Sequence, residues 1–184
     1  ADTRVKSVYA DLATFLPVRR KPKMENATFK GIQVEDASYV NKKIKTEDCA
    51  TVLLAFENGS RGVVTISQVS SGRKNRLFFE INGSQSSLMW DAEIPNQLWI
   101  GHRDEPNQLM IKDPSIMKES ARWTASYPGG HAEGYPDTFK QLHKAFFEYI
   151  QAGNFDAAPN FPTFTDGHNM LLVEEAIQKS AKES

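Results

Sequence analysis

Residues 127–137 hold the densest set of side chains that could take part in chemistry. They read Y-P-G-G-H-A-E-G-Y-P-D, which places an imidazole (His131) and a carboxylate (Glu133) among glycines, just before a predicted helix. Glycines let a backbone approach a ligand closely, and free N–H groups at a helix start favour polar ligands. Such a loop could present acid–base groups to a polyol or a carbonyl compound. His131, Glu133 and Tyr135 are therefore candidate ligand contacts, although the glycines could equally form a turn in which His131 satisfies a carbonyl.

Two hydrolytic alternatives use the same pair of side chains. His131-x-Glu133 matches the H-x-E of zinc deaminases, but the P-C-x-x-C that completes their zinc site is absent from the sequence. Glu133 and a second carboxylate could form the acid/base pair of a hydrolase, but nothing in the sequence sets their separation. A hydrolase using His131 and Glu133 therefore stays as an alternative, and no metal site is expected.

Trp123 is the aromatic candidate for the wall of a ligand cleft. A flat indole ring can stack on the C–H face of a sugar, and Trp123 stands in the polar stretch that leads to the Gly-Gly loop. Trp90 and Trp99 fall within predicted strands, where a packed ring with a satisfied N–H is the commoner situation. The sequence therefore favours Trp123 for the cleft and packing roles for the other two.

Composition and missing motifs exclude several function classes. The 184 residues carry 22 basic and 23 acidic side chains, a net charge of −1, so no field attracts nucleic acid or an anionic membrane. Cys49 is the only cysteine, which rules out an intrachain disulfide and fits a cytoplasmic protein. No apolar run reaches the roughly 20 residues of a membrane span. Neither G-x-G-x-x-G nor a phosphate loop occurs, so the chain predicts no nucleotide site of its own.

Strand patterns come first along the chain. Asn58-Gly59 and Asn82-Gly83 predict tight reversals, the first with positive φ at both turn positions. Residues 17–47, with R-R-K-P-K at 19–23, read as a long solvated connection holding one short strand. Short turns between consecutive strands indicate an antiparallel meander. The predicted strands are 4–16, 49–57, 62–71, 76–82, 87–91, 97–101 and 108–112.

Two helices close the chain. Pro136 and Asp137 suit the first turn of a helix that ends near Gly153. A second helix is expected to start at Thr163, with Asp166 reaching back to its first turn. Strands followed by helices indicate an α+β domain. The apolar stripes comprise Tyr135, Phe139, Leu142, Phe146 and Tyr149 in the first helix, and Met170, Val173, Ile177 and Ala181 in the second.

Both faces of the predicted sheet carry apolar side chains. Val52 and Leu54 point one way, whereas Leu53 and Ala55 point the other. The chain's own helices can cover one face. The second face calls for another domain or another subunit.

The chain resembles the C-terminal domain of the glucose-fructose oxidoreductase, inositol dehydrogenase and rhizopine-catabolism (Gfo/Idh/MocA) family. The resemblance runs from about Val5 to Ala181, and four stretches in this order carry it. They are T-E-D-C-A-T-V-L-L-A-F-E-N-G-S-R-G-V-V-T-I-S-Q-V (46–69), G-R-K-N-R-L-F-F-E-I-N-G (72–83), Y-P-G-G-H-A-E-G-Y-P-D-T-F (127–139) and F-P-T-F-T-D-G-H (161–168).

The resemblance implies a nicotinamide-dependent oxidoreductase acting on a sugar, a polyol or a related compound. In that family an N-terminal Rossmann domain holds NAD or NADP, and an open sheet with helices on one face shapes the substrate cleft and supports oligomers. The Rossmann glycines, the lysine of E-K-P and the D-x-x-x-H motif would all lie before Ala1. Residues 1–184 are thus expected to be a single C-terminal domain that binds no cofactor and supplies no catalytic residue.

The partners expected for the chain are the missing Rossmann domain, a small polyol or sugar-like substrate, and a second copy on the open sheet face. Substrate contacts are assigned to His131, Glu133, Tyr135 and Trp123. Arg73 and Lys74 follow a turn from which they could reach cofactor or substrate, a solvated turn being the simpler account. A free-standing binding or assembly module is the alternative from another class.

Overall fold

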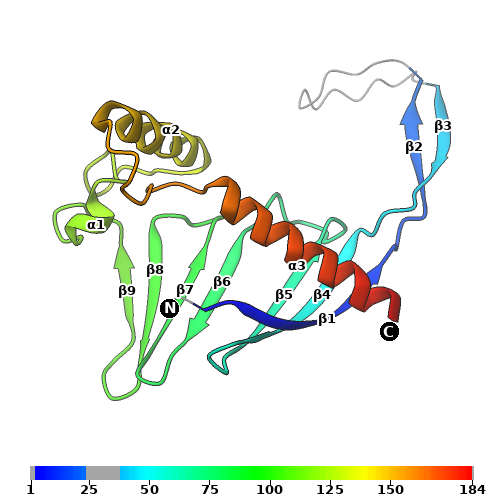
Figure 1. Cartoon of the computed structure of the whole chain (residues 1–184), viewed down its shortest axis with the longest axis horizontal. Helices are drawn as coiled ribbons and strands as arrows, with labels where there is room; N and C mark the ends of the chain where they lie inside the picture. The colour runs from blue at the N-terminus through cyan, green and yellow to red at the C-terminus, as the bar shows by residue number, and fades with distance from the viewer. Residues whose placement is uncertain (1–2, 24–37, 184) are drawn as a thin grey trace. The chain divides into compact units, whose positions relative to one another are not determined.

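The computed structural model describes residues 3–23 and 38–183, and its contacts divide the chain into two compact units. The first unit is formed by Ala1–Ser71 with Phe164–Ser184, and the second by Gly72–Thr163. Strands dominate the first part of the chain and helices the last, as Figure 1 shows by its colours. All strand pairs are antiparallel in the described part, so the expected α+β class with open, mainly antiparallel sheets is confirmed.

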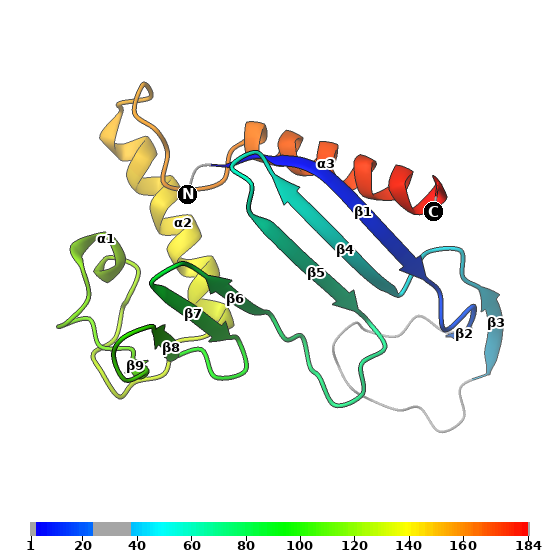
Figure 2. The same ribbon diagram turned by 90° about the horizontal axis from the view of Figure 1, so that it is seen from below.

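The first unit is built on a three-stranded sheet in the order β1 (Val5–Ala13), β4 (Cys49–Phe56), β5 (Arg61–Ser67). Helix α3 (Phe164–Glu183) packs along β1, as Figure 2 also shows. The Ser180 hydroxyl accepts the backbone N–H of Ala10 at 3.1 Å, which fastens the helix to the strand. Ala10 and Val52, opposite each other in the register, are the most buried apolar residues of the described chain, at 0% and 2% exposure.

The two faces of this sheet differ in the way the alternation predicted. Val52 is buried under α3, whereas Leu53, the next residue, is 50% exposed. Tyr9 and Val63 pair with Leu53 from the two flanking strands and are also exposed, which gives an apolar row across the open face. An exposed row of this kind is a candidate contact for another protein surface.

The Asn58-Gly59 reversal is not the predicted turn. Gly59 has a φ of 87°, but Asn58 has no positive φ. The Gly59 N–H donates to the Phe56 carbonyl, the Phe56 N–H donates to the Ser60 carbonyl, and the Asn58 side chain accepts the Ser60 N–H. The loop is therefore a type I turn followed by a glycine bulge, in which only the glycine needs the left-handed region.

The predicted connection of residues 17–47 holds two strands instead of one. β2 (Val18–Pro22) pairs with β3 (Tyr39–Lys43) to form a separate two-stranded ribbon, and residues 24–37 lie outside the described part. Where the chain leaves β1, the buried Asp48 carboxylate accepts the N–H groups of Phe15 and Leu16 at 2.8 and 2.9 Å. This carboxylate ends β1 three residues earlier than the pattern predicted, because it satisfies N–H groups that a longer strand would pair.

The second unit contains the last four strands of the predicted meander, which form a four-stranded sheet separate from that of the first unit. Its strands are β6 (Phe78–Asn82), β7 (Ser86–Asp91), β8 (Gln97–His102) and β9 (Gln108–Ile111), in this order across the sheet. The short helix α1 (Glu119–Arg122) and the long helix α2 (Tyr135–Ala152) follow β9.

Helix α2 begins and ends where the sequence predicted. The Asp137 carboxylate accepts the Gly134 N–H at 2.9 Å at its start, and Gly153 has a φ of 67° at its end. Helix α3 begins at Phe164, directly after Thr163. Of the α2 stripe, Phe146 and Tyr149 make edge-to-face contacts with Phe161. No helix of the described part combines the length and the apolar character that crossing a membrane requires.

Candidate functional site

The second unit contains a cavity of about 1050 Å³ at one end of its sheet. Its wall combines the entry to β6, the β7–β8 connection, the residue after β9 and the first two turns of α2. The Trp90 ring forms part of it, with its N–H donated to the Pro95 carbonyl at 3.0 Å, as expected of a packed tryptophan. The lining includes Lys74, Asn75, Arg76, Trp90, Asn96, Lys112, Glu133, Tyr135, Thr138 and Gln141.

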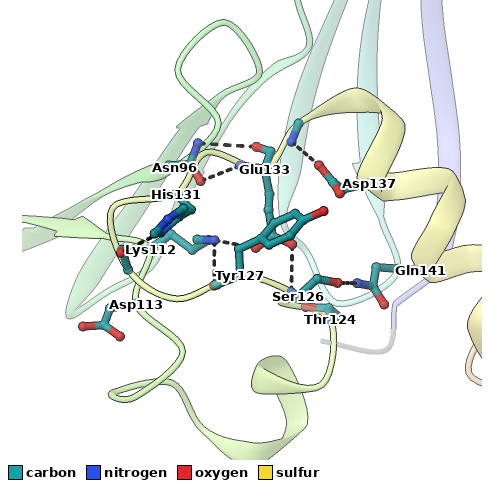
Figure 3. Close-up of polar contacts among 12 residues, drawn as sticks. Asn96, Lys112, Asp113, Thr124, Ser126, Tyr127, His131, Glu133, Asp137 and Gln141 are labelled. Carbon is teal, nitrogen blue, oxygen red and sulfur yellow. Dashed lines mark hydrogen bonds and ion pairs between the residues drawn. The ribbon is translucent and has the colours of Figure 1, made fainter.

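A polar network beside the cavity holds the glycine-rich loop (Figure 3). The Lys112 ammonium forms an ion pair with the Glu133 carboxylate and also donates to the Tyr127 carbonyl at 3.1 Å. The other Glu133 oxygen accepts the Ser126 N–H at 2.8 Å. Both charged side chains are largely buried, with 12% and 10% of their surfaces exposed. Glu133 and Lys112 thus join the start and the end of residues 126–133, which we call the His131 loop.

The electrostatics keep Glu133 ionised. Burial alone would raise the pKa of the Glu133 carboxyl, but hydrogen bonds from Lys112 and from the N–H groups of Ser126 and Tyr127, with the Lys112 charge, lower it. A carboxylate held this way is a poor proton donor near neutral pH. Both carboxylate oxygens of Glu133 are thus bound by groups of the protein itself.

Two further contacts fix the loop. The Asn96 side chain accepts the Glu133 N–H at 3.2 Å and donates to the Glu133 carbonyl at 3.4 Å, so one amide clasps the backbone on both sides. Gly129 lies against Asp113, where an added Cβ would stand 3.2 Å from the carboxyl carbon. Gly130 has a φ of 82°, which favours glycine. The loop therefore depends on both glycines and on residues of the sheet.

The four predicted contact residues lie in different surroundings. Glu133 and Tyr135 line the cavity, and Tyr135 is 68% exposed. His131 is exposed on the loop, with its Nδ1 3.4 Å from the Gly129 carbonyl oxygen, and does not line the cavity. Trp123 is half-buried outside the lining, with Lys144 Nζ 5.8 Å from its ring centroid. The structure brings Glu133 and Tyr135 to one cavity and places His131 and Trp123 beside it.

The segment before β6 contains Arg73 and Lys74, for which the sequence left open a contact with cofactor or substrate beside the simpler account of a solvated turn. Arg73 pairs with Glu93 at 2.6 Å, and Arg76 pairs with Asp91 at the same distance. The Lys74 and Asn75 side chains have no polar partner in the described part and border the cavity. Asn75 has a φ of 94°, the single positive value among the described residues other than glycine. Strain of this kind gathers at functional sites.

Lys112 and Asn96 were missed altogether by the sequence reasoning. They are 21 and 37 positions from Glu133, and no local pattern links them to it. Lys112 also lines a second cavity of about 850 Å³, formed by β9, Ile116, Gly129 and Gly130. Among the described residues, no three His, Cys, Asp or Glu side chains gather into a group that could hold a metal ion.

Comparisons with known proteins find an oxidoreductase and a dehydrogenase as relatives of the chain. The chain is 25% identical over 147 residues to an uncharacterized oxidoreductase, YfiI, of Bacillus subtilis strain 168, covering 80% of this chain and 37% of that protein. It is 26% identical over 147 residues to levoglucosan dehydrogenase of Pseudarthrobacter phenanthrenivorans, covering 77% of this chain and 36% of that protein. The chain thus spans little more than a third of the length of these two relatives.

A solved structure shares the fold over the whole chain. It is an inositol dehydrogenase homolog from Azotobacter vinelandii complexed with NADH and myo-inositol, with a TM-score of 0.74 and 22% identity. The likeness covers 100% of this chain and 43% of that one. A family model, described as the C-terminal alpha/beta domain of an oxidoreductase family, matches residues 4–184. The chain therefore belongs to the Gfo/Idh/MocA oxidoreductases, as their C-terminal domain.

Proposed function

We propose that this chain is the substrate-side domain of a nicotinamide-dependent oxidoreductase that acts on a sugar, a polyol or a related compound. The observation that carries the proposal is the cavity of the second unit, with the His131 loop fixed beside it by a buried ion pair. The relatives named above include a levoglucosan dehydrogenase and an inositol dehydrogenase homolog complexed with myo-inositol. Levoglucosan and myo-inositol are both rich in hydroxyl groups. A cavity of about 1050 Å³ is ample for a molecule of that size.

The residues in and around this cavity fall into two groups. Tyr135, Lys74 and Asn75 offer polar atoms at its border, and His131 and Trp123 stand on the segments that frame it. These five are the proposed ligand contacts. Glu133 acts through the loop it holds, because its oxygens are already bound to Lys112 and Ser126.

The cofactor would be NAD or NADP, held by an N-terminal domain. A pyrophosphate seeks free N–H groups and positive charge at a helix start. In the described part, the first turn of α2 contains Asp137 and that of α3 contains Asp166, and these carboxylates disfavour an anion. The chain's own long helices therefore do not fit the dinucleotide, and the chain alone is expected to transfer no hydride.

A second copy of the protein is the proposed partner of the open sheet face. Tyr9, Leu53 and Val63 form an exposed apolar row on the face opposite α3. Burying apolar surface of this kind stabilises an interface by roughly 25 cal/mol per Å² before the costs of association.

The test is an assay of the full-length protein with NAD+ and NADP+ and a panel of hydroxyl-rich compounds that includes levoglucosan and myo-inositol. His131→Ala should lower kcat/KM at least tenfold, and Thr138→Trp should do the same by filling the cavity. His168→Ala, at an exposed histidine of α3, is the matched control and should change kcat/KM less than twofold. Full activity of both Thr138→Trp and His131→Ala would refute the cavity as the substrate site.

The alternatives make different predictions. A hydrolase would turn over an ester or a glycoside with this chain alone, using His131 and Glu133. The bound state of the Glu133 carboxylate argues against an acid role. A free-standing assembly module would show no dehydrogenase activity with any panel compound in the full-length protein.

A further inference from the structure

Lys112 contacts both ends of the His131 loop. Its ammonium reaches the start of the His131 loop through the Tyr127 carbonyl and the end of the loop through the Glu133 carboxylate. Its own backbone is fixed to the β7–β8 connection, because the Lys112 N–H donates to the Asn96 carbonyl at 2.8 Å. Asn96 in turn clasps the Glu133 backbone. One side chain therefore fastens both ends of the loop to the end of β9.

We propose that Lys112 is the positioning residue of the site: it holds the His131 loop closed and so sets where His131 stands for the substrate. The inference rests on the proposed function for the part that concerns substrate, but the closed loop itself is independent of any ligand. Lys112 touches no reacting atom in this account and acts through the loop.

The burial of the Lys112–Glu133 ion pair explains why the His131 loop stays closed. With 12% and 10% of their surfaces exposed, the two side chains have given up most of their hydration. A charge in such a place is tolerated only with its partner, because an unpaired buried ion keeps the full desolvation penalty. Opening the loop would separate the ions before either is fully rehydrated. Lys112 thus makes the His131 loop a fixed wall, not a lid.

The length of the side chain and its charge should both matter. Lys112→Met keeps the apolar stem but leaves Glu133 without its cation and Tyr127 without a donor. Lys112→Arg keeps the charge and the donors with a wider head group. Lys118→Met is the matched control, since Lys118 is exposed and its side chain has no polar partner in the described part.

The experiment measures hydrogen–deuterium exchange by mass spectrometry on the full-length protein, with no ligand added. In Lys112→Met, exchange in residues 126–133 should become at least tenfold faster, because the Glu133 carboxylate that accepts the Ser126 N–H is no longer held in place by its cation. In Lys112→Arg the exchange rate of this segment should lie between those of wild type and Lys112→Met. In Lys118→Met it should equal the wild-type rate. Peptides from β7 and β8 report whether the unit still folds. Glu133→Gln provides a second variant, expected to speed exchange in the same segment.

Steady-state kinetics distinguish a positioning role of Lys112 from a role in stability alone. On the compound that the full-length protein oxidises, Lys112→Met should lower kcat/KM about tenfold or more, mainly through KM, with partial recovery in Lys112→Arg. Unchanged loop exchange in Lys112→Met would overturn the inference. Faster exchange with unchanged kcat/KM, while His131→Ala is impaired, would also overturn it. If His131→Ala is unimpaired as well, the proposed substrate role of the loop fails, and the exchange data alone still establish Lys112 as the residue that closes it.

Discussion

The Trp99 ring covers the backbone of Gly101, two residues further along the same face of β8. A Cβ atom at Gly101 would stand only 2.8 Å from Cζ3 of that ring, and Gly101 is buried. The glycine therefore supplies the space in which the indole lies flat on the sheet. Without a side chain at position 101, Trp99 can pack along its own strand.

Replacing Gly101 should lower the free energy of unfolding. Gly101→Ala forces the Trp99 ring to move off the strand, and overpacking of this kind costs about 1–3 kcal/mol. The measurement is urea unfolding followed by tryptophan fluorescence, which also reports the displaced ring. Trp99→Leu combined with Gly101→Ala should recover part of the loss. An unchanged midpoint for the single variant would show that the ring has another place to go.

Replacing Gly167, in contrast, should raise the free energy of unfolding. This glycine lies within α3, and a Cβ there would meet no heavy atom within 4 Å. Alanine restricts the unfolded chain and favours the helix, so Gly167→Ala should raise the free energy of unfolding by about 0.5–1 kcal/mol. The same urea experiment measures it. A lower stability would indicate that α3 needs the glycine for a neighbour that contacts it.

Local turn and capping chemistry made the helices and most strands predictable from the sequence. Gly153 and Pro136 mark the ends of α2 because each acts within a few residues of itself. One short strand was predicted where the β2–β3 ribbon has two, because residues such as Arg19, Arg20 and Lys42 lack the alternating apolar pattern of a half-buried strand. These strands are exposed on both faces, so hydrophobicity carries no signal there.

The candidate site was predicted less completely than the fold. Glu133 and Tyr135 could be located because they belong to one short motif. The Glu133 partners could not, since Lys112 directly follows β9 and Asn96 lies in the β7–β8 connection, and only the register of the sheet brings them to the loop. The carboxylate that suggested chemistry in the sequence is thus bound in the structure by residues without any motif.

Asp48 should make stability depend on pH in the acid range. The pKa of its carboxyl is lowered mainly by the Phe15 N–H, opposed by burial and supported by the Leu16 N–H and by Arg19. A lowered pKa stabilises the fold above the unfolded value of about 3.9, and the effect is lost as the pH falls through the folded pKa. Asp48→Asn should therefore lower the melting temperature at pH 7, with a difference from wild type that shrinks below about pH 4. A difference that is constant from pH 7 to pH 3 would contradict this assignment.

The open face of the first unit should govern assembly. Leu53→Arg places a charge in the centre of the Tyr9–Leu53–Val63 row without touching the side buried under α3. If a second copy covers this row, the variant should shift the full-length protein to a smaller species in light scattering after size exclusion. Thr51→Arg, on the same face and strand, tests how far the contact reaches. An unchanged mass for Leu53→Arg would exclude this row from the interface.

Asn75 should show opposing effects on stability and activity. Its φ of 94° costs a side chain of this size about 1 kcal/mol or more, whereas glycine adopts such a φ freely. Asn75→Gly should therefore leave the free energy of unfolding unchanged or raise it by up to about 1 kcal/mol, the gain being limited by the entropy of the unfolded glycine. If the amide binds substrate at the border of the cavity, the same variant should lower kcat/KM severalfold in the full-length enzyme. Asn75→Ala separates the two effects, since it removes the amide but keeps the strain. A variant Asn75→Gly that is both stable and fully active would mean that the strain serves only the turn into β6.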